Sequence, residues 1–126
     1  IMDARRSQVY NAFYEFKDGK LTEIHKQDTR SIDEVISIAE ESGRKVVFLG
    51  DGVPVYREKI EGHENFIIAP QHCNMQKAST VAALAFNYAN EGKAVKCDNF
   101  APFYLRKSQA ERELEEKKKA MEEGKE

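Results

Sequence analysis

The stretch SIDEVISIAEESGRKVVFLGDG, residues 31–52, decides the fold class of this chain. Ser31 and Glu34 have the spacing of a capping box, in which each side chain bonds the backbone amide of the other residue, so a helix is expected to begin there. Apolar residues recur at helical spacing from Ile32 to Ala39. Gly43 then favours the left-handed backbone conformation that ends a helix. Residues 45–49 form a short apolar run that is typical of a buried, parallel strand. The stretch therefore predicts a helix that leads into a buried strand, the repeating unit of an α/β fold.

A β-hairpin is predicted on the N-terminal side of this stretch. Residues 8–16 are rich in β-forming side chains on both alternating faces, which predicts a strand that is covered on both sides. The pair Asp18-Gly19 tolerates the positive φ angles of a two-residue hairpin turn. Residues 21–25 would then form the returning strand.

Two further helices and one strand are predicted on the C-terminal side. Pro54 suits the first turn of a short helix that ends near Ile60, and residues 66–69 indicate a second buried strand. The alanine-rich residues 77–90 predict a helix that packs closely against a sheet. The predicted order is a hairpin followed by α-β-α-β-α, with right-handed crossovers and helices on the sheet faces.

The last part of the chain differs in composition. Residues 93–107 contain several aromatic side chains and Pro102, so we expect an extended connection that docks through its aromatics. A second capping box at residues 108–111 opens a helix of mostly Glu and Lys, which pairs such as Glu113 with Lys117 support and whose far end should fray. We therefore expect an α/β part at residues 1–107 and a charged C-terminal helix at residues 108–126.

The composition predicts one domain with no membrane contact. At 126 residues the chain suits a single core, and 20 Lys and Arg against 22 Asp and Glu give a formal net charge of −2. No apolar run approaches the roughly 20 residues of a membrane span, and the first residues lack the apolar core of a secretory signal. Cys73 and Cys97 fit neither a disulfide scaffold nor a zinc knuckle. We expect a cytoplasmic protein with free thiols.

The turn at Gly50, Asp51 and Gly52 is the first candidate site. It lies between a buried strand and a predicted helix, which is the position of a phosphate-binding turn. However, the Asp51 carboxylate would repel a phosphate, and the turn is much shorter than a Walker loop or a dinucleotide-binding fingerprint. A structural turn is the favoured interpretation.

Nothing in the sequence predicts a complete catalytic, metal or cofactor site. The soft metal ligands do not stand at metal-binding spacings; they are His25, His63, His72, Cys73 and Cys97. Cys73 has only the adjacent His72 as a local base, and its geometry there is poor for a nucleophile. We expect no enzymatic activity and no cofactor.

Two basic clusters remain, Arg5-Arg6 and Arg106-Lys107, and both lie beside predicted aromatic segments. One interpretation is a contact with an anion or with RNA. The other is a set of surface ion pairs worth less than about 1 kcal/mol each. The net charge of −2 favours the ion pairs, because nonspecific binding of nucleic acid needs a broad basic face.

Three segments together resemble one known family. DARRSQVY at residues 3–10 is similar to the start of the C-terminal lobe of TsaB-type proteins, also called YeaZ and grouped with the glycoprotease-like M22 proteins. PFYLRKSQAE at residues 102–111 is similar to that family's C-terminal motif, and VFLGDG at residues 47–52 to its strand and turn. The resemblance covers nearly the whole chain.

The resemblance implies an actin-like, ribonuclease H-like lobe from a protein of two duplicated α/β lobes. The first lobe of the family has no counterpart here, so the chain looks like the C-terminal half. The implied role is that of a noncatalytic scaffold for threonylcarbamoyl transfer to adenosine of tRNA. The implied partners are a TsaD-type transferase and a TsaE-type ATPase, and the contact with tRNA would be indirect. The alternatives are a glycoprotease-like peptidase, a nucleotide hydrolase or a module that contacts tRNA directly.

Nine residues are the resulting candidates for interaction or for a structural motif. They are Asp3, Arg5, Arg6, Gly50, Asp51, Gly52, Tyr104, Arg106 and Lys107. Self-association is a further expectation, because a lobe separated from its mate exposes apolar surface.

Overall fold

The computed structural model describes residues 1–106 together with residues 110, 111, 114, 117 and 121. Much of the predicted charged helix lies outside the described residues, including Lys107 and Ser108, the first residue of its capping box. The boundary predicted at residue 107 is therefore left as a prediction.

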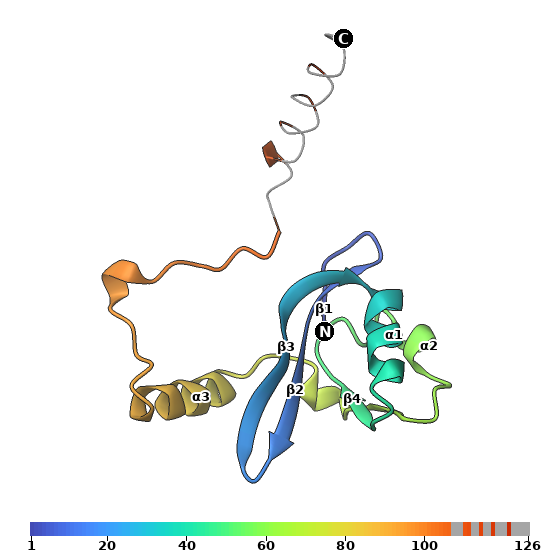
Figure 1. The fold of residues 1–126 in the computed structure, drawn as a ribbon, viewed down its shortest axis with the longest axis horizontal. Coiled ribbons are helices and arrows are strands. Elements are labelled where there is room, and N and C mark those ends of the chain that lie inside the picture. Colours follow the sequence, from blue (N-terminus) through green and yellow to red (C-terminus); the bar gives the residue numbers. More distant parts are fainter. Residues whose placement is uncertain (107–109, 112–113, 115–116, 118–120, 122–126) are drawn as a thin grey trace.

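The described residues form a mixed α/β structure (Figure 1). An antiparallel sheet has the order β1-β2-β3, and β4 pairs with β5 in parallel. The strands are β1 (Met2–Asp3), β2 (Gln8–Lys17), β3 (Lys20–Ser31), β4 (Val46–Phe48) and β5 (Phe66–Ile68). The α-helices are α1 (Ile32–Glu41), α2 (Arg57–Ile60) and α3 (Ala78–Asn90), and short 3-10 turns occur at Gln71–Cys73 and Cys97–Asn99. In this described part no helix combines the length and apolar character needed to cross a bilayer.

The predicted hairpin is confirmed, although its returning strand is longer than expected. Asp18 and Gly19 form the turn with φ angles of 51° and 75°. β3 continues to Ser31 because its polar residues pair with β2 around the buried Asn11. The Asn11 amide donates to the Asp28 carbonyl at 3.1 Å, and Arg30 donates to the Asn11 side-chain oxygen at 2.9 Å. Hydrogen bonds to the buried Asn11 amide thus extend β3 through residues that lack the alternating apolar and polar pattern of a strand.

The helix predicted from the capping box is also confirmed. The Glu34 amide donates to the Ser31 hydroxyl at 3.2 Å, and the Ser31 amide donates to the Glu34 carboxylate at 2.8 Å. Gly43 follows the helix at φ 62°. The buried face of α1 packs into the main core; the core residues are Val9, Ile32, Val35, Ile36, Ala39, Phe48, Val53 and Ile60.

Ser31→Ala should lower the free energy of unfolding by about 1 kcal/mol at pH 7, because the N-cap acceptor is lost. The Ser31 hydroxyl, then the Ser31 amide, hold the pKa of Glu34 below its ordinary value. A lowered pKa stabilises the fold only while the carboxylate is charged. That part of the stability is therefore full above about pH 4.3 and is lost as the pH falls through the pKa of the folded state.

Urea titrations of both proteins at pH 7 and pH 3 would measure this difference. The gap between wild type and Ser31→Ala should narrow at pH 3. An equal gap at both pH values would contradict the contribution of Glu34.

Ile1 lies between the two sheets and joins them through its backbone. Its nitrogen donates to the Leu49 carbonyl at 2.7 Å, and its carbonyl accepts from the Gly52 amide at 3.3 Å. The structure thus differs from the single continuous sheet that the element order predicts. The backbone contact between the two sheets involves few hydrogen bonds, because β1 is only two residues long.

The predicted helix at Pro54 begins later than expected. Pro54 lies in an irregular turn, and α2 starts at Arg57, three residues further on. The Tyr56 amide donates to the Gly52 carbonyl at 3.2 Å in a single turn around Pro54, and the bonds of α2 itself begin at the Tyr56 carbonyl, which accepts from the amides of Lys59 and Ile60. Proline φ permits a helix start at that point but does not require one.

Three predictions of close packing are wrong for this chain. No residue of α3 is buried, and Phe86 on this helix is 67% exposed. Figure 1 shows α3 set apart from the sheets, whereas the segment after it turns back toward them. The aromatic segment does not dock, since Tyr104 is 81% exposed, and the far end of β2 is open, since Phe16 is 73% exposed. Periodicity shows that a face is apolar but does not show what covers it.

Candidate functional site

The turn between β1 and β2 has the most unusual backbone of the described residues. We call residues 4–8 the arginine turn. Its three central residues, Arg5, Arg6 and Ser7, have φ angles of 63°, 54° and 58°. Each left-handed residue with a side chain costs about 1–2 kcal/mol. The surrounding contacts must therefore hold this turn in place.

Backbone hydrogen bonds close the arginine turn at both ends. The Ala4 amide donates to the Gln8 carbonyl at 2.9 Å, and the Gln8 amide donates to the Arg5 carbonyl at 3.0 Å. The Ser7 carbonyl accepts from the amide of Ile32, the first residue of α1, at 3.2 Å. The turn is thus tied to the helix that covers the core.

Asp3 and Tyr56 support the turn from within the structure. The Asp3 carboxylate accepts from the Arg5 amide at 3.0 Å and from the Tyr56 hydroxyl at 3.3 Å. Burial, and then the negative charge of Asp3, raise the pKa of Tyr56 above its ordinary value. The hydroxyl therefore stays protonated and remains a donor. Tyr56 was not among the predicted site residues, and nothing in its local sequence indicates a contact with β1.

Arg106 connects the C-terminal segment to the arginine turn. Its guanidinium donates to the Ala4 carbonyl at 2.9 Å, across 102 positions of sequence. This contact brings together two of the segments that resemble the TsaB-type family, residues 3–10 and residues 102–111. It also places Arg106 in a structural role, whereas Tyr104 nearby is exposed.

The Gly50-Asp51-Gly52 turn is packed against the first residue of the described chain. Gly50 has φ 109°, and a Cβ built on it would overlap the Ile1 carbonyl oxygen. A Cβ on Gly52 would meet Asp3 N at 3.2 Å. Because the backbone of β1 occupies the space beside the turn and α2 begins only at Arg57, the structural interpretation is favoured over phosphate binding.

The predicted soft ligands are not brought together. His25 stacks edge-on against Phe13, and His63 lies 2.7 Å from the Glu40 carboxylate. Cys73 and Cys97 are exposed free thiols. Among the residues whose placement is described, no three His, Cys, Asp or Glu side chains gather in a way that could hold a metal ion.

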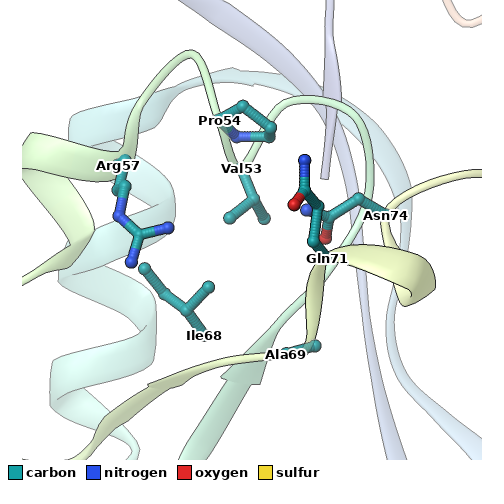
Figure 2. Close-up of a pocket in the computed structure, with 7 residues that line it drawn as sticks. All are labelled: Val53, Pro54, Arg57, Ile68, Ala69, Gln71 and Asn74. Carbon is teal, nitrogen blue, oxygen red and sulfur yellow. The ribbon is translucent and has the colours of Figure 1, made fainter.

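A shallow cavity of about 220 Å³ lies between α2 and the start of the loop after β5 (Figure 2). Figure 2 shows Arg57 at one side and the amides of Gln71 and Asn74 at the other, with apolar side chains between them. Asn74 is buried, and its side-chain oxygen has no hydrogen-bond partner within the described part. A bound water would satisfy this oxygen, so the cavity does not by itself indicate a ligand.

Comparison with known proteins adds one relative. TsaB of Bacillus subtilis (strain 168), a tRNA threonylcarbamoyladenosine biosynthesis protein, is 32% identical over 115 residues, which cover 88% of this chain. The chain is related to TsaB. No family model matches the sequence.

The relationship to TsaB confirms the family suggested by the three segments. The chain spans about half the length of the curated relative that it matches, since the alignment covers 48% of TsaB. The similarity to TsaB thus extends over most of this chain and over about half of TsaB.

Proposed function

We propose that this chain is the C-terminal lobe of a TsaB-type protein and supports threonylcarbamoyl transfer to adenosine of tRNA as a noncatalytic scaffold. The observation that carries the proposal is the 32% identity to B. subtilis TsaB over 88% of the chain. The proposed partners of the complete protein are a TsaD-type transferase and a TsaE-type ATPase, acting in the cytoplasm.

The absence of catalysis is part of the proposal, and the contacts of the titratable groups support it. Asp3 holds a turn, Glu34 caps a helix, and His63 pairs with Glu40. Cys73 lies exposed in a 3-10 turn. The two acids and the histidine make structural contacts, and among the described residues Cys73 has no hydrogen bond to a base that would activate its thiol. Nucleophilic catalysis requires such a base.

The proposed lobe has the ribonuclease H-like strand order β3-β2-β1-β4-β5. The bonds that Ile1 makes with Leu49 and Gly52 support this order, because they place the start of β1 beside the end of β4. The outer face of the parallel pair is apolar and half exposed at Val47 (52%) and Ile67 (47%). Parallel strands are normally covered on both faces.

Helix α3 leaves that face uncovered, since none of its residues is buried. Its exposed apolar residues include Val81 and Phe86, which lie on different sides of the helix. Gln76, just before α3, already contacts the Met2 sulfur at 3.8 Å. The other lobe of the complete protein is the part that we propose to cover both the exposed face of the parallel pair and the apolar residues of α3.

A chimaera tests the proposed function. The matching half of B. subtilis TsaB is replaced by this chain in cells depleted of TsaB, and threonylcarbamoyladenosine in total tRNA is measured by mass spectrometry of nucleosides. We expect the modification to be retained, because the chain would supply the lobe that the transferase partner requires. Loss of the modification while the chimaera accumulates as folded protein would contradict the proposal.

Variants of the same chimaera test whether the lobe takes part in chemistry. Cys73→Ser and Asp51→Asn remove a thiol and a carboxylate with little change of volume, and His72→Ala removes the adjacent imidazole. All three should keep the modification level of the parent chimaera. A folded variant that loses the modification would identify a catalytic group and favour an enzymatic role instead.

A further inference from the structure

We propose that the arginine turn and the aromatic segment that Arg106 anchors beside it form a binding surface for a single-stranded segment of RNA. The choice of RNA over other polyanions rests on the proposed function. The surface itself rests on the backbone of the turn, the exposure of its side chains and the contact of Arg106 with Ala4.

The strain of the arginine turn is the first observation. Strained backbone gathers at functional sites, where contacts around it keep it in place. The hairpin turn of the same chain reaches positive φ with Asp18 and Gly19, which tolerate it. The arginine turn reaches positive φ with two arginines, for which the conformation is unfavourable. Glycine would relieve the strain but would supply no charge.

The exposure of the two arginines is the second observation. The Arg5 side chain is 89% exposed, and its ion pair with Asp3 is long at 3.4 Å. The Asp3 carboxylate already accepts from the Arg5 amide and from Tyr56, so it is held within the turn. Arg6 is exposed as well. Both guanidinium groups are therefore accessible to phosphate oxygens.

The aromatic segment is the third observation. Phe103 is 79% exposed and Tyr104 is 81% exposed, three and two residues before the anchored Arg106. Exposed aromatic rings next to arginines are typical of proteins that stack single-stranded bases, because every base offers a π face and the arginines follow the backbone. A duplex hides its bases from such rings. The surface should therefore prefer a loop to a duplex.

The net charge of −2 does not conflict with a local site of this kind. A few phosphate contacts give weak, salt-sensitive binding, whereas a broad basic face would give strong nonspecific binding. Affinity should fall between 50 and 200 mM salt, with a slope that reports the number of phosphates contacted.

Fluorescence anisotropy with a labelled 17-nucleotide RNA hairpin, and with a fully paired RNA of the same length, tests the proposal on the 126-residue chain. We expect the hairpin to bind more tightly than the duplex. Arg6→Gly should weaken hairpin binding and lower the salt slope by about one, while the protein unfolds at the same or a higher urea concentration. Weaker binding by a more stable variant cannot result from misfolding.

Two further variants separate the parts of the surface. Phe103→Ala combined with Tyr104→Ala should weaken hairpin binding about tenfold and leave duplex binding unchanged. Lys26→Ala removes an exposed cation from β3, away from the turn, and should bind the hairpin like wild type.

Several results would overturn the proposal. These are no hairpin binding at 50 mM salt, equal binding of hairpin and duplex, unchanged affinity in Arg6→Gly, or an equal loss in Lys26→Ala. Binding of a TsaD-type partner that depends on Arg6, with no RNA binding, would assign the surface to a protein and also overturn it. Because the chimaera assay reads tRNA modification independently, failure of RNA binding alone leaves the proposed function standing.

Discussion

Gly50→Ala is expected to lower the free energy of unfolding by about 2–5 kcal/mol. Gly50 has φ 109°, a conformation that side chains rarely adopt, and its new Cβ would overlap the Ile1 carbonyl oxygen. That carbonyl accepts from the Gly52 amide, so it cannot move without loss of the contact between the two sheets. Conformational strain and steric overlap therefore act together.

Gly19→Ala is the matched control. Gly19 also has positive φ, at 75°, but a Cβ there would meet nothing within 4 Å. Its cost should be only the conformational part, about 1 kcal/mol. Urea denaturation followed by circular dichroism measures both variants. Equal losses would show that the contact between Gly50 and Ile1 does not matter to stability.

Ile60→Ala should lower the free energy of unfolding by a similar amount, about 2–5 kcal/mol. Ile60 is fully buried, and its neighbours in the core include Val53 and Phe48. α2 has only four residues, so helix propensity alone cannot keep it formed. The buried isoleucine holds α2 against the core, and its loss leaves a cavity and frees the helix.

Ile67→Ala provides the comparison at an exposed site. Ile67 lies on β5 and is 47% exposed, so truncation leaves no closed cavity and should cost less than about 1 kcal/mol. The two variants remove the same atoms, and the difference between their denaturation midpoints isolates the effect of burial. A cost at Ile67 as large as that at Ile60 would mean that α3 or a second copy covers this face in solution.

Elements with local signals could be predicted from the sequence. The capping box at Ser31 and Glu34 and the stop at Gly43 define α1 because their partners lie within one helical turn. The turn at Asp18 and Gly19 sets the hairpin for the same reason. The parallel pairing of β4 with β5 follows from two apolar runs separated by a helix.

Elements with distant partners could not be predicted in this way. β3 extends beyond its predicted end because Asn11 on β2 requires partners. α2 begins at Arg57 and not at Pro54, because local proline geometry only permits a helix start. The candidate site could be predicted only in part. The charge of the arginines marked them in the sequence, whereas nothing in the sequence indicated the positive φ angle of Ser7 or the contact of Tyr56 with Asp3.

The sequence by itself determined the order of helices and strands, the α/β class and the resemblance to TsaB-type proteins, because each depends on spacing along the chain. The tertiary structure alone decided that Gly50 packs on Ile1, that Tyr56 holds Asp3 and that Arg106 reaches Ala4. These contacts join residues about 50 to 100 positions apart, and the geometry of each depends on the packed core. Local propensity carries no information about such distances, so only the folded chain could show that the two arginine segments meet.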